Sequence, residues 1–286
     1  MNGNMIKVIV NADDFGFCPS VNEGVILAHR EGILTSATLM ANAPGFDQAV
    51  ALSRENPGLG VGVHLNLVRG RPLSDPSRIP SAVAPDGRFR GSVYKIIRKY
   101  FAGSIRPADV EAEWRAQIEK VLTAGIVPTH LDSEKHMHTF PPFFRIALKL
   151  ARDYRIRAVR FINERCLSLS PAQSVKSVFI AVCCRSMRKP IRNHGIMTVD
   201  RFYGVCHSGR MTAPRIRRIL ERAGEGVSEI MVHPGRLTEE LVALEREFGS
   251  YYINNLREVE LRALVDPDLK RVVRERGIRL ISYGGM

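Results

Sequence analysis

The sequence lacks the features that mark several large classes of protein. Its longest uncharged apolar run, Val178 to Cys184, is far shorter than the roughly 20 residues that a membrane-spanning helix needs. No GxxxxGK(S/T) or GxGxxG run supports nucleotide binding, no GxSxG elbow suggests a serine hydrolase, and no CxxC spacing suggests a cysteine zinc site. The five cysteines, an odd number, do not suggest a disulfide framework, so we expect reduced thiols. No signal-peptide layout opens the chain, and we therefore expect a cytoplasmic protein.

The excess of positive charge is confined to one part of the chain. Lysine and arginine number 42 and the acids 29, which gives a net charge of +13. Residues 145–222 contain 18 basic and 4 acidic residues, whereas the remainder is nearly neutral. Such a block is a solvated face, a nucleic-acid patch or a surface that meets anionic lipid. The only tryptophan is Trp114, and the aromatic interleaving of single-strand binders is missing, so we predict no nucleic-acid partner.

Apolar strand-like runs alternate with helical patterns along nearly the whole chain. The predicted strands are Ile6–Val10, Ala37–Ala41, Gly60–Leu67, Val127–Leu131, Ala158–Ile162, Gly195–Val199, Glu229–Val232 and Arg279–Ser282. The predicted helices are Val21–Glu31, Phe46–Glu55, Ala108–Ala124, Phe143–Tyr154, Ala213–Ala223 and Asp268–Glu275. Strands separated by helix-length stretches indicate parallel βαβ units, and seven or eight such units suit an incomplete β/α barrel. No linker divides the chain, so we predict one α/β domain over residues 1–286.

Two stretches interrupt this alternation. Residues 69–91 are rich in Pro, Gly, Ser and Asp and predict a long loop of the kind that shapes binding sites. Residues 174–193 join a short apolar stretch to a basic one, and a helix there is amphipathic only in part. We interpret this second stretch as an insertion.

The first predicted strand is followed by two adjacent carboxylates. Asp13 and Asp14 come after Asn11, and on extended chain they point in different directions. One can then bind a metal while the other faces the substrate as a base. An Asx-turn or a helix cap after the strand explains the same pair without chemistry.

The next strand ends supply imidazoles. His64 lies in an apolar setting with Asn66 two positions on, and a lone histidine in such a place is usually a hydrogen-bonded core residue. The segment THLDSEKHMHTFPP gathers histidines and carboxylates at alternate positions, namely His130, Asp132, Glu134, His136 and His138. Such clustering is typical of a site for Zn²⁺ or a similar ion, and a solvated polar strand end is the alternative.

Two later strand ends are weaker candidates. Arg160 and Glu164 follow the fifth predicted strand, where a guanidinium can orient a carboxylate or bind a substrate oxygen. His233 precedes a Pro-Gly turn and suits a general acid at the rim of a site. A buried ion pair or a turn histidine explains them equally well, and Asp200 carries less weight still.

These residues together resemble a known family. The run VNADDFGFCPSVNEGVILAHREGILTSATLMAN, then GVHLNL, PTHLDSEKHMHTFP and MVHPG, is similar over nearly the whole chain to the YdjC-like carbohydrate deacetylases. It also looks like the branch of that family associated with hopanoid lipid biosynthesis. The resemblance implies a distorted β/α barrel and a divalent metal, Mg²⁺ or Zn²⁺, that activates water to hydrolyse an N-acetyl group.

Roles follow from the resemblance position by position. Asp14 and His64 match metal ligands, and Asp13 matches the carboxylate expected to act as base. His233 falls where related deacetylases place a general acid, and Arg160 falls near their site-orienting arginine.

One departure puts the third metal ligand in doubt. The family commonly has DSHHHVH where this chain has DSEKHMH, so Glu134 stands in place of a ligand histidine and is followed by Lys135. Glu134 either binds a harder ion, or binds nothing and leaves His136 or His138 to complete the shell, or marks a weakened metal site. Lys135 opposes cation binding by repulsion. Asp132, His136, His138 and Arg160 are assigned to the substrate or to a secondary site.

The expected reaction is metal-assisted hydrolysis of an N-acetylated amino sugar. Asp13 removes the proton of water and His233 protonates the departing amine. The basic block favours a glycolipid substrate, such as an N-acetylglucosaminyl hopanoid, and peripheral contact of residues 174–193 with an anionic membrane at its cytoplasmic face. The alternatives are a metal-dependent phosphoester hydrolase and a non-catalytic lipid-binding barrel. A homodimer is also allowed, although no pattern in the chain specifies an oligomeric state.

Overall fold

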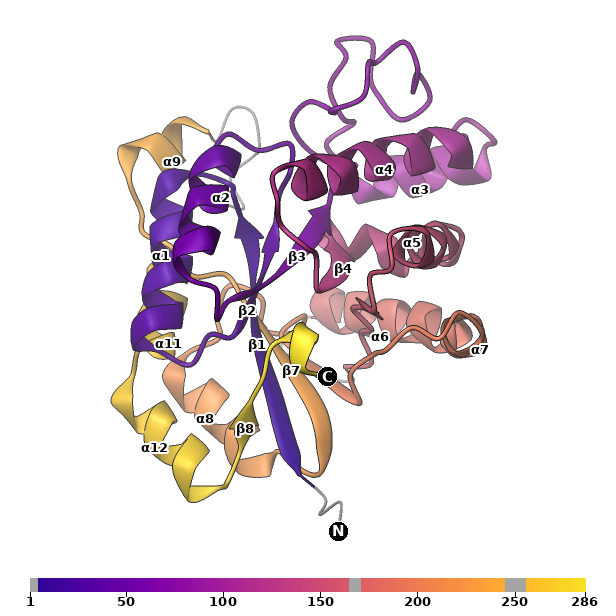
Figure 1. Cartoon of the computed structure of the whole chain (residues 1–286). Coiled ribbons are helices and arrows are strands. Elements are labelled where there is room, and N and C mark those ends of the chain that lie inside the picture. Colours follow the sequence, from indigo (N-terminus) through magenta and orange to yellow (C-terminus); the bar gives the residue numbers. More distant parts are fainter. Residues whose placement is uncertain (1–4, 165–170, 245–255) are drawn as a thin grey trace.

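One parallel sheet organises the chain. The computed structural model describes residues 5–164, 171–244 and 256–286, without the side chains of 171–174 and 176. Its eight strands follow the order β5-β4-β3-β2-β1-β7-β6, with β8 paired to β1 (Figure 1). They are β1 Ile6–Phe15, β2 Ser36–Leu39, β3 Gly60–Leu65, β4 His130–Ser133, β5 Ala158–Val159, β6 Arg201–Tyr203, β7 Gly226–Val232 and β8 Arg279–Leu280. Every ladder between them is parallel.

Helices connect successive strands and cover the sheet. They are α1 Pro19–Glu31, α2 Phe46–Glu55, α3 Val93–Phe101, α4 Pro107–Thr123, α5 Pro141–Asp153, α6 Pro171–Ser186, α7 Arg188–Asn193, α8 Ala213–Arg222, α9 Glu239–Ala243, α11 Leu256–Leu264 and α12 Pro267–Glu275. Six of them, α1, α4, α5, α6, α8 and α12, have proline in the first two positions, where its missing N–H is not needed. In Figure 1, α1, α2, α8, α11 and α12 lie on one side of the strands, and α3 to α7 lie on the other.

The sheet curls into a barrel whose edges scarcely meet. Among the described residues, the edge strand β5 meets the segment before β6 at one bridge, between Ala158 and Met197. Two backbone hydrogen bonds flank it, from the Val159 amide to the Met197 carbonyl (3.3 Å) and from the Met197 amide to the Arg157 carbonyl (2.9 Å). The predicted single-domain α/β fold with an incomplete, distorted β/α barrel of parallel strands is confirmed.

One predicted strand is wrong. Residues 195–199 form only the bridge at Met197, and the strand begins later, at Arg201. The chain leaves β5 at this point and crosses to β7, where the Asp200 amide donates to the Val227 carbonyl (2.8 Å). The Asn163 side chain donates to the Asp200 carbonyl (2.6 Å) and holds the crossing in place.

The other predicted elements are present, with shifted ends. The strand β1 continues through Asp13 and Asp14 instead of ending at Val10, and β4 starts at His130 rather than at Val127. The helices α3, α6, α7, α9 and α11 were not among the predicted helices. Residues 69–91 form the expected long loop, in which Val83 and Phe89 make one antiparallel bridge. Residues 174–193 belong to α6 and α7 in the connection from β5 to β6, and their status as an insertion stays a prediction.

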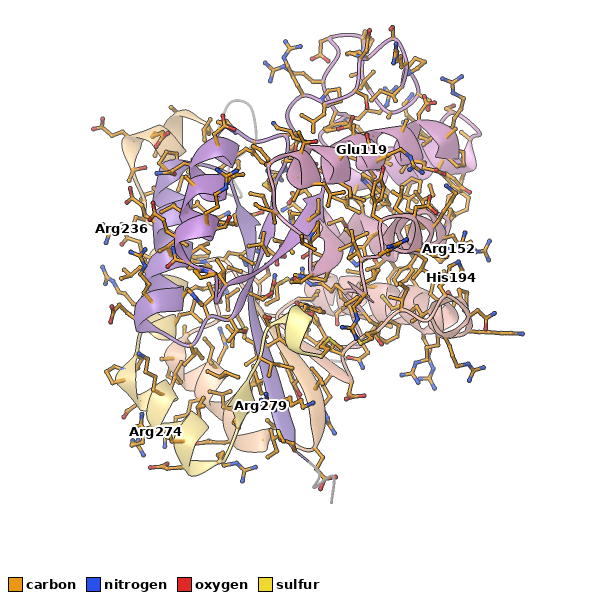
Figure 2. All side chains as sticks on the ribbon, viewed as in Figure 1. Glu119, Arg152, His194, Arg236, Arg274 and Arg279 are labelled. Atoms are coloured by element: carbon orange, nitrogen blue, oxygen red, sulfur yellow. The ribbon has the colours of Figure 1, made fainter. Side chains whose placement is uncertain are left out.

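The interior is apolar and the surface is charged. Buried side chains of β1, such as Val8 and Val10, pack with those of the neighbouring strands and helices into one core. Arginines such as Arg152 and Arg274 project outward (Figure 2). The expectation of reduced thiols holds for Cys18, Cys183 and Cys184 but is wrong for Cys206, which is disulfide-bonded. Within the described residues, no helix combines the length and apolar character needed to cross a bilayer.

Candidate active site

Polar side chains from four strand ends meet in one small cavity at the carboxyl edge of the sheet. Its volume is about 20 Å³, close to the space that a single water molecule or ion needs. The lining residues are Asp13, Asp14, His64, Glu134, Lys135, His136, Ser208 and His233. Parallel strands bring their carboxyl ends to the same edge, so residues far apart in the sequence become neighbours here.

The Asp13 carboxylate is held by a buried arginine. Arg160, on the segment after β5, donates to both oxygens of Asp13 at 2.8 and 2.7 Å. The same guanidinium lies 2.6 Å from Asp132 and 2.8 Å from Glu229, and all four side chains are buried. Burial alone would raise the pKa of Asp13, but the charge and hydrogen bonds of Arg160 hold it well below its usual range. Asp13 is therefore ionised, and Arg160 fixes its orientation.

His64 presents one ring nitrogen to a pair of carboxylates. Its Nδ1 lies 2.8 Å from Oδ1 of Asp132, which fixes the orientation of the ring. Its Nε2 is buried without a hydrogen-bond partner and lies 3.6 Å from both Asp14 Oδ1 and Glu134 Oε2. Although burial lowers the pKa of His64, the charge of Asp132 raises it well above its usual value overall. The carboxylates around His64 therefore favour a cation between them, either a proton on His64 or a metal ion.

Two groups of side chains have the spacing of a metal site. The ligand atoms of Asp14, His64 and Glu134 lie within 4.8 Å of one another, as do those of Asp13, His64 and Asp132. In the second group Arg160 already holds both carboxylates. The first group leaves the unpartnered Nε2 of His64 directed between two carboxylates, with Asp132 behind its other nitrogen, which is the arrangement of a metal-ligating histidine. The cluster of Asp14, His64 and Glu134 fits a divalent ion.

An unusual backbone places Glu134 in the cavity. Lys135 and His136 both have positive φ, 52° and 59°, inside the short 3₁₀ helix η1, Glu134–Thr139. Non-glycine residues rarely adopt this region, and two in succession mark a strained turn. Asp14, with φ of 67°, is a third member of the site in the same region. The strain is concentrated in residues that line the cavity.

Three cations surround the cluster of carboxylates. Arg257, from α11, lies 2.6 Å from Asp14 Oδ2. Arg69 Nε and Lys135 Nζ lie 3.6 and 4.0 Å from Glu134 Oε1. Glu134 therefore shares its charge with two basic side chains, which weakens its hold on a metal ion relative to an isolated carboxylate.

His233 is supported by a carboxylate that the sequence patterns did not reveal. Oε2 of Glu260 accepts a hydrogen bond from the His233 amide at 2.5 Å and lies 3.7 Å from its Nδ1. Burial opposes protonation, but the hydrogen bond and charge of Glu260, together with Asp13 and Asp14, raise the pKa of His233 overall. A protonated His233 is the form that can donate a proton.

The remaining candidates divide into a cavity residue and supporting residues. His136 lines the cavity. His138 lies outside it, with Nδ1 2.6 Å from Ser133 Oγ and Nε2 3.1 Å from the Arg160 carbonyl oxygen. Burial and the charge of Arg160 lower the pKa of His138 to about 3, so the imidazole is neutral. It supports the backbone of Arg160 through its hydrogen bond.

His130 and Glu164 also lie away from the cavity. His130 stacks on Tyr283, with ring centroids 3.8 Å apart. Glu164 accepts hydrogen bonds from the amides of Gly204 and Cys206, each at 3.1 Å. Both residues position backbone or packing partners rather than the reacting groups.

Several residues of the site were missed by the strand-end rule. Arg69 comes from the long loop, Ser208 from the loop after β6, and Arg257 and Glu260 from α11. No motif in the sequence singles them out. For Arg257 and Glu260 the signal is that both charges are buried on one helix, α11, and it can be used only once the helix is known.

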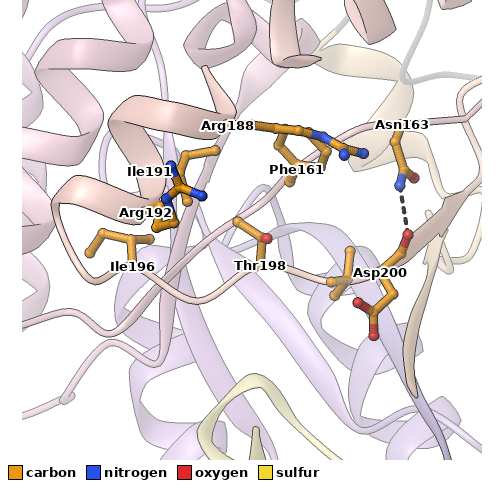
Figure 3. A pocket seen from close by; sticks show the side chains of 9 residues that line it. Phe161, Asn163, Arg188, Ile191, Arg192, Ile196, Thr198 and Asp200 are labelled. Atoms are coloured by element: carbon orange, nitrogen blue, oxygen red, sulfur yellow. Dashed lines mark hydrogen bonds between the residues drawn. The ribbon is translucent and has the colours of Figure 1, made fainter. Parts of the chain in front are cut away.

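A second hollow lies apart from this cavity. It has a volume of about 370 Å³ and lies beside α7, between the segment after β5 and the segment before β6 (Figure 3). Arg188 and Arg192 of α7 line it, with Phe161 and Asn163 from the opposite wall. None of the residues named for the first cavity lines this hollow.

Comparisons with known proteins agree on one family. The family model described as "YdjC-like protein" matches residues 7–275. Carbohydrate deacetylases of Brevibacillus brevis and Geobacillus stearothermophilus are 36% and 35% identical to this chain, over 97% and 96% of it and 98% and 96% of their own lengths. A solved structure from Enterococcus faecalis V583, called a "putative cellobiose-phosphate cleavage protein", superposes with a TM-score of 0.76 at 28% identity and 98% coverage of both chains. The predicted resemblance is confirmed: the chain belongs to the YdjC-like family.

Proposed function

We propose that this chain is a carbohydrate N-deacetylase that depends on a divalent metal and hydrolyses the N-acetyl group of an amino sugar. The observation that carries the proposal is the buried, unpartnered Nε2 of His64 between Asp14 and Glu134, with Asp13 and His233 lining the same cavity. Relatives of nearly equal length that are named carbohydrate deacetylases support the substrate class.

The chain's own residues divide the work of the reaction. Asp14, His64 and Glu134 would hold the ion, which when bound supplies Lewis-acid polarisation of the acetyl carbonyl. Asp13 accepts a proton from the attacking water while Arg160 keeps both carboxylate oxygens in place. As the C–N bond breaks, His233 donates its proton to the departing amine, with Glu260 stabilising the imidazolium. Water is consumed, and acetate and the free amino sugar are released.

The identity of the ion follows from the ligands. Two carboxylates and one imidazole form a harder set of ligands than one carboxylate and two imidazoles, the set that a histidine in place of Glu134 would give. We therefore propose that Mg²⁺ competes with Zn²⁺ for this site. Arg69 and Lys135 beside Glu134 lower the affinity for either ion.

We further propose that the amino sugar is carried by a glycolipid, such as an N-acetylglucosaminyl hopanoid, and that the enzyme works in the cytoplasm at the inner membrane face. The basic block of residues 145–222 supports this proposal, because a neutral soluble oligosaccharide gives no reason for it.

The test is metal content and acetate release, measured together for three forms of the protein. Wild type is expected to bind one ion and release acetate from a soluble chitooligosaccharide or an N-acetylglucosaminyl lipid. Glu134→Ala is expected to lose both properties, and Glu134→His to recover both. If neither change affects them, His136 becomes the third ligand. If wild type binds no metal and releases neither acetate nor phosphate, the chain is not a hydrolase of this kind.

A further inference from the structure

The outer face of α6 exposes a row of large apolar side chains. Val175, Val178, Phe179 and Val182 are 70%, 51%, 52% and 62% exposed. Their spacing of three, one and three residues places them on one face of the helix, side by side over two turns. Scattered exposed apolar residues are ordinary, but a contiguous row on one helix face marks an interaction surface.

The opposite face of α6 is also apolar and is already packed. Ile180 and Cys184 are buried against the body of the protein, as is Met187 just after the helix. The hydroxyl of Ser177 donates to the Glu164 carbonyl at 3.0 Å and ties the helix to the chain just after β5. Helices that are apolar all round are normally buried on all sides, so the exposed row of α6 calls for a cover.

Positive charge continues this face toward α7. Residues 171–193 contain five basic residues and no acidic one. Arg185, Arg188, Lys189 and Arg192 are all exposed. A row of apolar side chains followed by a cluster of cations is the composition of helices that lie in the surface of an anionic membrane.

We propose that the outer face of α6 and α7 docks on an anionic lipid bilayer, with the four apolar side chains inserted and the four exposed cations at the headgroups. Hereafter this surface is the docking face, defined by Val175, Val178, Phe179, Val182, Arg185, Arg188, Lys189 and Arg192. This inference rests on the proposed function in one respect, namely that the substrate of the enzyme is a lipid-linked sugar.

Two features connect the docking face to the rest of the molecule. It starts near the catalytic cluster, because α6 packs against η1, which carries Glu134. At its other end Arg188 and Arg192 line the hollow of about 370 Å³, together with Asp200 and with Asn163, whose amide donates to the Asp200 carbonyl (Figure 3). A lipid-linked substrate would then lie along the face, with its sugar at the cavity.

Charge decides against the other occupants. A second copy of the chain, docked symmetrically, would bring two clusters of cations together with no acid in either segment. Nucleic acid would neutralise the cations but would leave the apolar row uncovered. An anionic bilayer satisfies both halves of the face.

Co-sedimentation of the full metal-loaded protein with vesicles tests the proposal. Wild type is expected to bind mixed phosphatidylcholine–phosphatidylglycerol vesicles and not vesicles of phosphatidylcholine alone, and added salt is expected to weaken the binding. The double variants Phe179→Ser with Val182→Ser and Lys189→Glu with Arg192→Glu are each expected to lower the partition coefficient roughly tenfold or more.

Matched controls separate the docking face from general hydrophobicity and charge. Tyr94→Ser with Val127→Ser removes two side chains of 86% and 83% exposure elsewhere, and Arg218→Glu with Arg274→Glu reverses two exposed charges on α8 and α12. Both control pairs are expected to bind vesicles like wild type. The four variants alter only surface residues, so their far-UV circular dichroism and melting temperatures should match that of wild type.

Each outcome has a distinct meaning. Equal binding by all four variants, or binding that ignores phosphatidylglycerol, overturns the docking face. A wild-type dimer that becomes a monomer in light scattering when Phe179 and Val182 are replaced assigns the face to a second copy instead. Acetate release from a soluble chitooligosaccharide should be the same in all variants. Vesicle binding without any acetate release would reject the proposed function and keep the docking face.

Discussion

At the scale of single residues, Arg160 is the centre of the site. A fully buried guanidinium is tolerated only when it is paired, and here Asp13, Asp132 and Glu229 surround it. Three carboxylates exceed the single positive charge, and the protein relieves the excess at Glu229. Burial raises the pKa of Glu229 to about 7, and the Tyr283 hydroxyl donates a hydrogen bond to it. Asp13, whose pKa Arg160 holds below its usual range, is the carboxylate of this group that lines the cavity.

Replacing Asp13 by asparagine tests its role as the proton acceptor. Asp13→Asn keeps the size of the side chain and one oxygen for Arg160 but removes the acceptor, so kcat for acetate release should fall roughly 10²–10⁴-fold. The metal content should stay near that of wild type, because Asp13 is already held by Arg160 rather than by the proposed ion. Wild-type turnover by a folded Asp13→Asn protein would remove Asp13 from the mechanism.

The charge of Glu260 should be visible in the pH profile. It raises the pKa of His233, and the protonated form is the one that donates, so activity is lost as pH rises through that pKa. Glu260→Gln removes the charge and lowers the pKa of His233, so the alkaline limb of kcat should move to lower pH and the rate at alkaline pH should fall several-fold.

Glu260→Gln is not expected to shift the acidic limb of the pH profile, so that limb serves as the internal control. Glu260 also accepts a hydrogen bond from the Met211 amide, and any loss of folded protein in Glu260→Gln reduces the whole profile in proportion. A profile that is scaled down without any shift of its alkaline limb would show that Glu260 is structural only.

Sequence patterns locate the residues at the strand ends and miss those that reach the site from elsewhere. Asp13, Asp14, His64, Glu134 and His233 meet in one cavity because parallel strands share a carboxyl edge. Their roles stay predictions. Arg257 could not be found this way, since it meets Asp14 across 243 positions of sequence from a helix that no pattern predicted.

At the scale of elements, a close approach between α1 and the turn after β7 positions His233. Gly24 of α1 faces Gly235, and a Cβ at Gly24 would lie 2.6 Å from the Gly235 Cα and 2.9 Å from its amide nitrogen. Both contacts are with backbone, so neither can be relieved by a change of rotamer. The absence of a side chain at Gly24 therefore lets the turn that follows His233 pack directly against α1.

Gly24→Ala should force these two elements apart. Overpacking of this kind costs about 1–3 kcal/mol, so the urea midpoint should fall, and kcat should fall as His233 moves. Gly58→Ala is the matched control, because a Cβ there meets only the His29 ring at 3.5 Å. Equal stability and activity of the two variants would mean that the turn can shift without consequence.

The predicted elements fail where tertiary contacts override local pattern. The run at residues 195–199 has the apolar composition of a strand, but it pairs with the edge strand β5 only at Met197. The chain then moves to β7, and the strand forms there at Arg201–Tyr203 instead. Composition records the tendency to be extended, whereas the choice of partner depends on how the barrel closes.

At the scale of the whole molecule, the alternation of strands and helices was sufficient to predict one parallel barrel. That the barrel is incomplete was predicted, but the position of its open seam, between β5 and β6, was not, because it depends on a crossing held by Asn163 and Asp200. The basic block of residues 145–222 spans this seam, so α6, α7 and the second hollow fall within the most positive part of the chain.

The last prediction concerns the stability of the molecule as a whole when divalent ions are removed. An ion that binds the folded cluster of Asp14, His64 and Glu134 stabilises the fold, by about 2.7 kcal/mol at a free concentration of about 100 times its Kd. For a domain of this size that corresponds to a rise in melting temperature of roughly 5–10 °C. Chelation should therefore lower the melting temperature of wild type by that amount, and Mg²⁺ or Zn²⁺ should restore it.

The shift belongs to the cluster only if it disappears with one of its members. Glu134→Ala should melt at one temperature with and without the ion, whereas Glu221→Ala, which removes an exposed carboxylate on α8, should keep the full shift. A wild-type melting temperature indifferent to both ions would instead assign the neutralisation of Glu134 to Arg69 and Lys135. The strained turn would then hold Lys135 as a permanent cation beside Glu134.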